Sequence, residues 1–370
     1  MSPAAPRAAN LVAAPAAYRW TMVCVGVIAN PASGRDIRRL VAGASVFGNA
    51  DKAGMVLRAL AGLGAAGVDR ALMMPASDGL SATLRRQLQA HAPEHLDGAA
   101  PFPSLEELPI RLTGTADDSA RAVELMRGAG VAAILVLGGD GTHRVVAKHA
   151  REVPLCALST GTNNAFPELR EATVAGLATG LVATGQVGGG MLRREAALEV
   201  ELSNGERDLA LVDVAVSAER FVGARALWRS ADVSELLVTF ANPSAVGLSA
   251  VAGLLQPLAR GAGRGLYVAL SPTREDAALT LKVPLAPGLV VPVGVNRFRT
   301  IELGESIALT PGRGCLALDG EREIECGPDE RTIVRLVAGP STIDIDAVMR
   351  SAAVKRLLCF DPTAQQARRE

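Results

Sequence analysis

Residues 132–142 read AAILVLGGDGT, an apolar run that leads into three glycines and an aspartate. A short apolar run that ends at turn residues is typical of a buried strand, and the residues after Thr142 have helical spacing. Glycines let a phosphate approach backbone N–H groups closely, and a helix N-terminus adds partial positive charge. The stretch therefore predicts a strand, a phosphate-binding loop and a helix.

The same pattern recurs on both sides of this stretch. Further apolar runs bounded by turn residues lie at 22–28, 71–75, 109–112 and 154–160, and helix-like stretches lie at 55–63, 81–91, 116–127 and 143–150. Strands that alternate with helices indicate βαβ units around a parallel sheet. We expect a Rossmann-like α/β domain over residues 21–175.

The pattern changes in the second half of the chain. Period-two alternation of apolar and polar residues begins near Ala197 and continues to Val337. This alternation predicts a mostly antiparallel β domain over residues 176–345, in which 225–259 is expected to form a helical insertion. Residues 346–370 are predicted to form a C-terminal helix and tail, and the Ala/Pro-rich residues 1–20 a disordered leader.

Composition excludes several classes of function. The 38 basic and 38 acidic residues balance, so no basic field predicts a nucleic-acid or membrane partner. No apolar run approaches the roughly 20 residues that a membrane span needs. The five cysteines are widely separated and odd in number, which argues against a disulfide framework. We therefore expect a cytoplasmic protein.

Asp140 is an unusual residue inside a glycine loop, because a carboxylate repels phosphate. It would be useful there if it held Mg²⁺ or accepted the proton of an attacking hydroxyl. The alternative is structural, with Asp140 as the N-cap of the helix that follows.

Two further polar loops follow predicted strands, Asn30–Gly34 (NPASG) and Ser159–Asn164 (STGTNN). Each could be a simple turn or an Asx-type cap, although hydroxyl, amide and glycine groups also suit phosphate and ribose. Because all three loops end strands of one predicted parallel sheet, we expect them to converge on one crevice. The candidate nucleotide-binding residues are Asn30, Ser33, Gly34, Gly138, Gly139, Gly141, Thr142, Thr160, Gly161, Thr162, Asn163 and Asn164.

The motifs NPxSG, GGDGT and GTxN, in this order, resemble the superfamily shared by NAD kinases and diacylglycerol or sphingoid lipid kinases. Residues 29–40 (ANPASGRDIRRL) and 221–228 (FVGARALW) resemble more specifically the acetoin-catabolism protein X branch, which is classed with the ATP-NAD kinases. The resemblance covers about residues 21–345. It implies a Rossmann-like domain followed by a β domain, with the active site in the cleft between them.

Asp319-Gly320-Glu321 is, from its residues alone, an Asp-Gly hairpin turn. In the superfamily that it resembles, however, a DG or DGE segment faces the glycine loop, and the lipid-kinase branch is taken to use the Glu as base. The resemblance implies that Glu321 and Asp319 are catalytic together with Asp140, and that Gly320 lies at the nucleotide site. Asp140 is expected to hold Mg²⁺ or to serve as the base, and Glu321 is the rival base.

Among the basic residues, Arg225 is expected to contact phosphate, because it lies in the family-like run 221–228. Four others could also clamp phosphate, although each is expected to be a solvated surface charge: Arg35, Arg38, Arg144 and Lys148. His143 could be only a first-turn helix residue, and Asp213 could face the cleft or solvent.

The resemblance implies an ATP-dependent kinase whose acceptor is the 2′-hydroxyl of the adenosine ribose of NAD. The chain departs from NAD kinases in having no Asn-Glu dipeptide, which in that family helps to hold the dinucleotide. Two alternatives therefore stay open: a kinase of another small-metabolite or lipid hydroxyl, and a non-catalytic nucleotide-binding accessory protein of acetoin catabolism. In either case nucleotides and small molecules are the expected partners, and the family resemblance allows a homo-oligomer.

Overall fold

The computed structural model describes residues 22–31, 47–90, 100–161, 164–218 and 232–359. The expected leader 1–20 and several predicted site residues lie outside the described residues: Ser33, Gly34, Arg35, Arg38, Thr162, Asn163 and Arg225.

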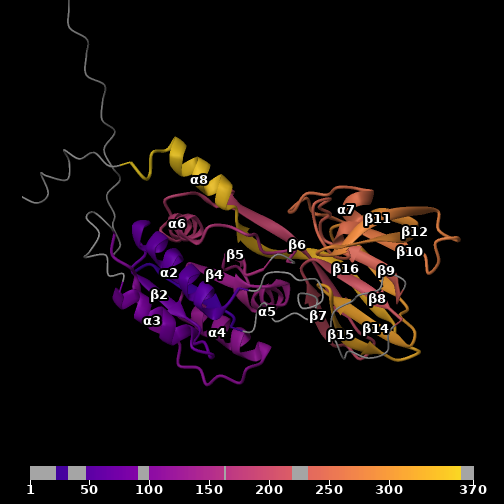
Figure 1. Cartoon of the computed structure of the whole chain (residues 1–370), viewed down its shortest axis with the longest axis horizontal. Helices are drawn as coiled ribbons and strands as arrows, with labels where there is room; N and C mark the ends of the chain where they lie inside the picture. The colour runs from indigo at the N-terminus through magenta and orange to yellow at the C-terminus, as the bar shows by residue number, and fades with distance from the viewer. Residues whose placement is uncertain (1–21, 32–46, 91–99, 162–163, 219–231, 360–370) are drawn as a thin grey trace, which may run out of the picture.

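The first half of the chain forms a parallel sheet in the order β3-β2-β1-β4-β5. Figure 1 shows this half, in indigo to magenta, at one end of the molecule and the orange strands of the second half at the other. Its strands are β1 (Cys24–Ala29), β2 (Arg70–Met73), β3 (Ser104–Glu107), β4 (Ala133–Gly138) and β5 (Leu155–Ser159). Every residue of β1 and β4 is buried, as expected for central strands with helices on both faces.

Helices cover both faces of this sheet, and the direction in which each strand side chain points decides which helix it meets. Val27 and Leu135 pack toward one group of helices, whereas Ile28 and Ile134 pack toward the other. The first group is α2 (Asn49–Ala65), α3 (Leu80–Ala90), α6 (Ala172–Ala183) and the C-terminal α8 (Ile345–Val354). The second group is α4 (Ala116–Gly128) and α5 (Asp140–Ala150). The predicted α/β class is confirmed.

The same sheet continues into strands from the second half of the chain. Beyond β5 come β16 (Thr332–Ile343), β6 (Leu192–Glu201) and β7 (Arg207–Ala210), and β13 (Ser306–Leu309) also pairs with β16. β16 contacts β5 in parallel at Thr342 and Leu155 and pairs with β6 antiparallel. The predicted domain boundaries at 175 and 345 stay predictions.

A second, antiparallel sheet has the order β11-β12-β10-β9-β8-β14-β15. Its strands are β8 (Asp213–Ser217), β9 (Val233–Val238), β10 (Arg264–Leu270), β11 (Leu279–Ala286), β12 (Leu289–Glu302), β14 (Gly314–Leu318) and β15 (Glu321–Cys326). One face packs on α7 (Ser249–Leu255), and the other packs on β6 and β16. The predicted antiparallel second half is confirmed.

Two local predictions were wrong. Residues 109–112 are not a strand, because the strand that pairs with β2 is the polar edge segment Ser104–Glu107, which shows no apolar run. The expected helical insertion at 225–259 contains β9 instead of a continuous helix, because its apolar residues 236–238 fill an interior strand of the second sheet.

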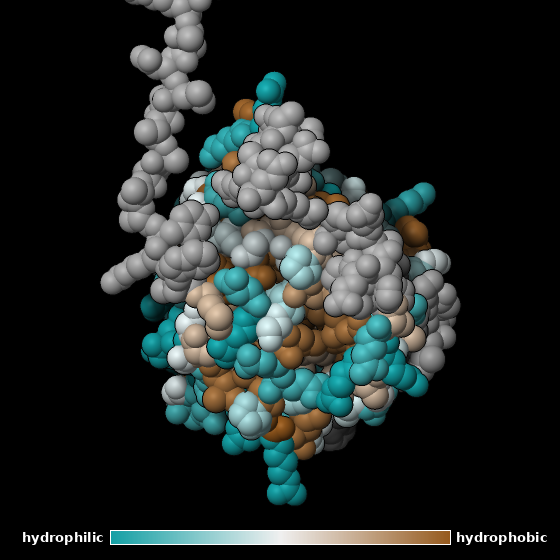
Figure 2. Space-filling view, turned by 90° about the vertical axis from the view of Figure 1, so that its left-hand side faces the viewer, coloured by the Kyte–Doolittle hydropathy of each residue, from teal (hydrophilic) through white to brown (hydrophobic). Residues whose placement is uncertain are grey.

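Seen from the side of the parallel sheet, the surface intersperses hydrophilic and hydrophobic residues (Figure 2). Of the helices that the structure describes, none combines the length and the apolar character that crossing a bilayer requires.

Helices α2 and α6 pack backbone to backbone through glycines. A Cβ added at Gly62 would lie 2.3 Å from the Thr173 carbonyl oxygen, and one added at Gly176 would lie 2.2 Å from the Ala59 carbonyl oxygen. Both distances are far below a van der Waals contact, so the helices could not keep their present separation.

We expect Gly176→Ala to lower the free energy of unfolding by about 1–3 kcal/mol, because the helices must separate to admit the methyl group. Gly128→Ala in α4 is the matched control, since a Cβ there meets no atom within 4 Å. Urea unfolding of both variants tests the packing. The close approach would be contradicted if the two variants were equally stable.

Candidate active site

Two of the three predicted loops contact each other directly at the ends of their strands. Asn30 follows β1, and its Nδ2 donates to Thr142 Oγ1 at 2.9 Å. The third loop is joined through the backbone, since the Thr160 N–H donates to the Gly138 carbonyl at 3.3 Å. The structure therefore brings together the described parts of all three loops, as the sequence predicts.

The glycine loop ends at Gly139, which is the N-cap of α5 and offers no capping side chain. The alternative that Asp140 is the N-cap is therefore wrong, since Asp140 is the first residue of the helix. Gly138 is required by close approach, because a Cβ there would lie 2.6 Å from the Thr142 Cβ. The first N–H groups of a helix have no acceptor within the helix, so those of α5 can bind an anion.

The Asp140 carboxylate, which is half-buried, accepts two backbone hydrogen bonds from the end of the STGTNN loop. The Ala165 N–H lies 3.1 Å from both Asp140 carboxylate oxygens, and the Phe166 N–H lies 2.8 Å from Oδ1. These bonds fix the orientation of the carboxylate and favour its ionised form.

Inside the STGTNN loop, side chains hold the backbone. Asn164 Nδ2 donates to Ser159 Oγ at 2.7 Å, and Ser159 Oγ donates to the Gly161 carbonyl at 2.6 Å. Thr160 is fully buried. Asn164 also lies beside the glycine loop, since its Oδ1 is 3.1 Å from where a Gly139 Cβ would be.

Asp319 and Gly320 form the two-residue turn between β14 and β15, with φ values of 53° and 77°. Asp319 Oδ1 accepts the N–H groups of residues 211–213 at 2.9, 2.7 and 3.3 Å, and Asp213 Oδ1 accepts the Gly320 N–H at 3.1 Å. The predicted hairpin turn is confirmed, and Asp319 anchors it to the start of β8. A catalytic role for Asp319 stays a prediction.

Arg144 lies between the α/β half and this hairpin. Its Nε is 3.8 Å from Asp319 Oδ2, and its Nη1 is 3.8 Å from Asp208 Oδ2. Arg144 is only 8% exposed, so the expectation that it is a solvated surface charge is wrong. Burial raises the pKa of Asp319 well above its ordinary value, and the Arg144 guanidinium opposes that rise.

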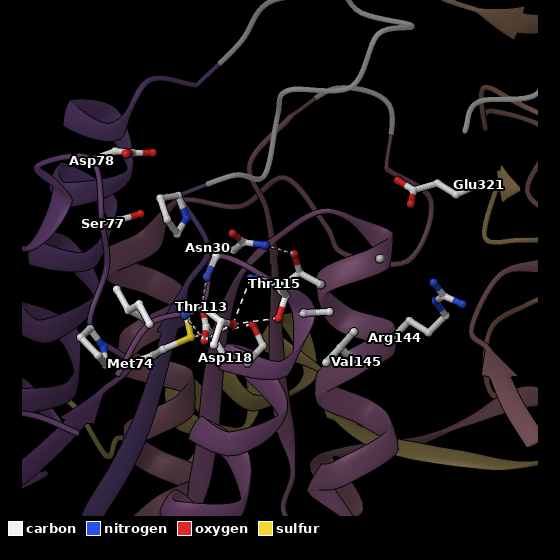
Figure 3. A pocket seen from close by; sticks show the side chains of 18 residues that line it. Asn30, Met74, Ser77, Asp78, Thr113, Thr115, Asp118, Arg144, Val145 and Glu321 are labelled. Carbon is white, nitrogen blue, oxygen red and sulfur yellow. Dashed lines mark hydrogen bonds between the residues drawn. The ribbon is translucent and has the colours of Figure 1, made fainter. Parts of the chain in front are cut away.

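A cavity of about 570 Å³ runs along the carboxyl ends of the parallel strands (Figure 3). Glu321 and Arg144 lie on one side, and Ser77 and Asp78 on the other, with Asn30 between them. A Cβ on Gly141 would lie 3.8 Å from Glu321 Oε2, so Glu321 faces the glycine loop. The Glu321 side of the hairpin and the loop therefore meet across this cavity.

The floor of the cavity is a loop that sequence reasoning missed, Thr113-Gly114-Thr115. Asp118 accepts the N–H groups of Thr113 and Gly114, each at 2.8 Å, and the Thr113 hydroxyl at 2.8 Å. Burial raises the pKa of Asp118, but these hydrogen bonds outweigh it and hold the pKa below its ordinary value. The Asp118 carboxylate therefore holds the loop just before α4, whose N-cap is the Thr115 hydroxyl. The sequence signal that could have revealed this loop is Thr-Gly-Thr directly before a predicted helix.

Lys52 is a second residue that the sequence did not reveal. It is 1% exposed, and its Nζ donates to the backbone carbonyls of Asn30 and Pro31 at 3.0 and 2.9 Å. The ammonium group therefore fixes the start of the NPASG loop. Nothing in the sequence distinguishes this lysine from one on a helix surface.

Asp140 is the residue whose chemistry fits a magnesium ion. Among the described residues, no three His, Cys, Asp or Glu side chains cluster as a metal site. Mg²⁺ needs no such cluster, because it is commonly held by one or two carboxylates together with substrate phosphates and waters. A single oriented carboxylate beside a helix N-terminus that suits an anion fits that mode of binding.

His143 is fully buried beside Asp140. Its Nδ1 lies 2.9 Å from the Gly139 carbonyl, and its ring lies 5.9 Å from the Phe166 ring, centroid to centroid. Burial lowers the pKa of His143 from 6.5 to about 4. The imidazole is therefore neutral at pH 7, and His143 is more than an ordinary first-turn helix residue because it packs the loop against Phe166.

Comparison with known proteins gives matches over both halves. The ATP-NAD kinase N-terminal domain matches residues 26–187, and the acetoin catabolism protein X C-terminal domain matches residues 196–339. Acetoin catabolism protein X of Cupriavidus necator is 44% identical over 341 residues, covering 90% of this chain and 93% of that protein.

The chain also aligns with solved structures. Two of them, described as diacylglycerol kinases of Bacillus anthracis, each align over 87% of this chain and 96% of theirs. Both are 13% identical, with TM-scores of 0.43 and 0.40.

The buried His143 predicts a loss of stability in acid. The folded chain holds the imidazole neutral down to about pH 4, whereas the unfolded chain binds a proton below about 6.5. Stability should therefore fall as pH drops through this window, by about 3 kcal/mol at pH 4. Urea unfolding of the wild type and His143→Gln between pH 4 and 7 measures this contribution. Parallel pH profiles of the two proteins would contradict a buried neutral histidine.

Proposed function

The chain belongs to the acetoin catabolism protein X family, and we propose that it is an ATP-dependent kinase that forms NADP by phosphorylating the adenosine ribose 2′-hydroxyl of NAD. Its first half matches the ATP-NAD kinase N-terminal domain, which gives it the fold of a kinase-type phosphotransferase. The observation that carries the proposal is the cavity where Glu321 faces Gly141, the residue that follows Asp140.

Two helix N-termini give the proposed donor nucleotide its orientation. The start of α4 is capped by Thr115, whose hydroxyl accepts the Asp117 N–H. The Asp118 carboxylate, which accepts the Thr113 and Gly114 N–H groups just before the helix, would also repel phosphate there. The first turn of α5 has no capping side chain. Its own carboxylate, Asp140, is hydrogen-bonded to the Ala165 and Phe166 N–H groups, and Mg²⁺ would neutralise it, so the N–H groups of α5 suit an anion. We therefore place the triphosphate of ATP at Gly141 and Thr142, and the nucleoside toward Thr113 and Ser77.

The two carboxylates of the site are suited to different tasks. Asp140 is held by two amide N–H groups, which favour the charged form that Mg²⁺ requires. Mg²⁺ bound with the phosphates would neutralise their negative charge. Glu321 faces the loop from the opposite side and is half-buried, so it is the proposed general base.

In the proposed reaction, the acceptor oxygen forms a bond to the γ-phosphorus of ATP. The bond between that phosphorus and the β–γ bridging oxygen breaks, and ADP leaves. The proton of the hydroxyl passes to the Glu321 carboxylate. The residues Asn30, Thr142 and Lys52 keep the loops in register for this transfer.

A second candidate is phosphorylation of another small-molecule hydroxyl. It is favoured by one observation, the absence of any Asn-Glu dipeptide from the sequence. We also propose that the protein is cytoplasmic and forms a homo-oligomer. Its proposed partners are nucleotides and small molecules, with no nucleic acid and no membrane.

Purified protein with ATP, Mg²⁺ and NAD should form NADP. Asp140→Asn and Glu321→Gln should each lower kcat by about 100-fold or more, because each removes one carboxylate from the transfer. Glu325→Gln is the matched control, an exposed carboxylate on the same strand as Glu321. An enzyme-coupled assay of NADP gives the rates.

Two results would contradict the proposal. Absence of NADP, although ATP binds in a calorimeter, would exclude NAD as the acceptor and favour another hydroxyl. Equal rates for Glu321→Gln and Glu325→Gln would exclude Glu321 as the base.

A further inference from the structure

The backbone at Ala165 and Phe166 is held from two sides. The Ala165 and Phe166 N–H groups donate to the Asp140 carboxylate, as described above. The carbonyl of Phe166 accepts a hydrogen bond from Arg260 Nη1 at 2.5 Å. Arg260 lies between α7 and β10, nearly a hundred residues along the chain from the loop that it contacts.

The guanidinium of Arg260 is itself fixed by several contacts. It pairs with both carboxylate oxygens of Glu195, at 2.8 Å from Nη2 to Oε1 and 3.3 Å from Nε to Oε2. It also stacks over the rings of Phe166 and Phe240, at 4.5 and 5.3 Å from their centroids. A bidentate ion pair combined with two ring contacts leaves an arginine little freedom.

Glu195 connects Arg260 to the strands of the first sheet. Its side chain is only 2% exposed, and the Thr342 hydroxyl donates to its Oε1 at 2.6 Å. Arg193 Nη1 lies 3.9 Å from the same oxygen. Glu195 belongs to β6 and Thr342 to β16, two neighbouring strands, so Arg260 is anchored on the rigid part of the fold.

We propose that Arg260 is a positioning residue for Asp140. Arg260 holds the carbonyl of Phe166. It thereby fixes the backbone whose N–H groups, at Ala165 and Phe166, orient the Asp140 carboxylate. The second half of the chain thereby determines the orientation of the carboxylate that is proposed to bind Mg²⁺. The role of that carboxylate rests on the proposed function, whereas the contacts that orient it do not.

A residue that only stabilised the fold would not act on Asp140 selectively. Without Arg260, the Phe166 carbonyl loses its donor, and the peptide can rotate relative to Asp140. The amides of Ala165 and Phe166 should then exchange with solvent faster than those of the rest of the chain. The Mg²⁺ requirement should change with them, because the carboxylate is less well oriented.

The test compares Arg260→Met and Arg260→Lys with Arg264→Met. Methionine keeps much of the length of the side chain without its hydrogen bonds, and Arg264 is an exposed arginine close by in sequence. Glu195 keeps the Thr342 hydroxyl and Arg193 in both Arg260 variants, which favours folding. Lysine preserves the positive charge but cannot make the bidentate pair, so it should give an intermediate effect if Arg260→Met folds poorly.

Three measurements are made on the full chain: hydrogen exchange by mass spectrometry, calorimetry of ATP with and without Mg²⁺, and NADP formation. In Arg260→Met, exchange in peptides covering residues 164–168 should be about 10-fold faster or more, with other regions unchanged. The Mg²⁺ concentration that gives half-maximal NADP formation should rise and kcat should fall, each by about 10–100-fold. The KM for NAD should stay nearly constant. Arg264→Met should behave as the wild type.

Unchanged exchange at residues 164–168, or faster exchange throughout the chain, would overturn the inference. A fall in kcat shared by Arg264→Met would also overturn it. If the wild type forms no NADP but the exchange and the Mg²⁺ dependence of ATP binding shift as expected, the acceptor assigned under the proposed function fails and the inference stands.

Discussion

The site depends on the parallel register of three neighbouring strands. Ala29 of β1 lies opposite Leu137 of β4, and Gly138 lies opposite Ser159 of β5. The chain therefore leaves each strand at the same level, and the residues that follow meet within hydrogen-bonding distance. A shift of one residue in either pairing would turn every side chain of the shifted strand to the opposite face and separate the loops.

The two helices that begin at this edge differ in how their N-termini are satisfied. The Thr115 hydroxyl caps α4 by accepting the Asp117 N–H, whereas α5 begins after a glycine that has no side chain to cap it. The Asp140 carboxylate, at the first residue of α5, bonds instead to the Ala165 and Phe166 amides. The two helix starts thus differ in whether a side chain already caps them, and this difference can orient a nucleotide. The arrangement needs the second half of the chain as well, because Glu321 and Arg260 both come from it.

Much of this arrangement could be predicted from the sequence, because local signals specify it. The apolar run before Gly138, the polar loops after two other strands and the Asp319-Gly320 turn each follow from a few adjacent residues. The strand Ser104–Glu107 was not predicted, because an edge strand needs no apolar run. The roles of Lys52 and Arg260 were not predicted, because the groups that they contact lie far away in sequence. Gly138 was expected to let a phosphate approach the backbone, whereas in the structure a Cβ at this position would collide with Thr142. Long-range side-chain contacts depend on tertiary packing, which no short motif encodes.

The most direct test of this account is a crystal structure with Mg²⁺ and a non-hydrolysable ATP analogue. The account predicts phosphates at the Gly141 and Thr142 amides, the metal in contact with Asp140, and the nucleoside toward Thr113. A nucleotide bound with its phosphates at the start of α4, or bound outside the cavity, would contradict the assignment of the site.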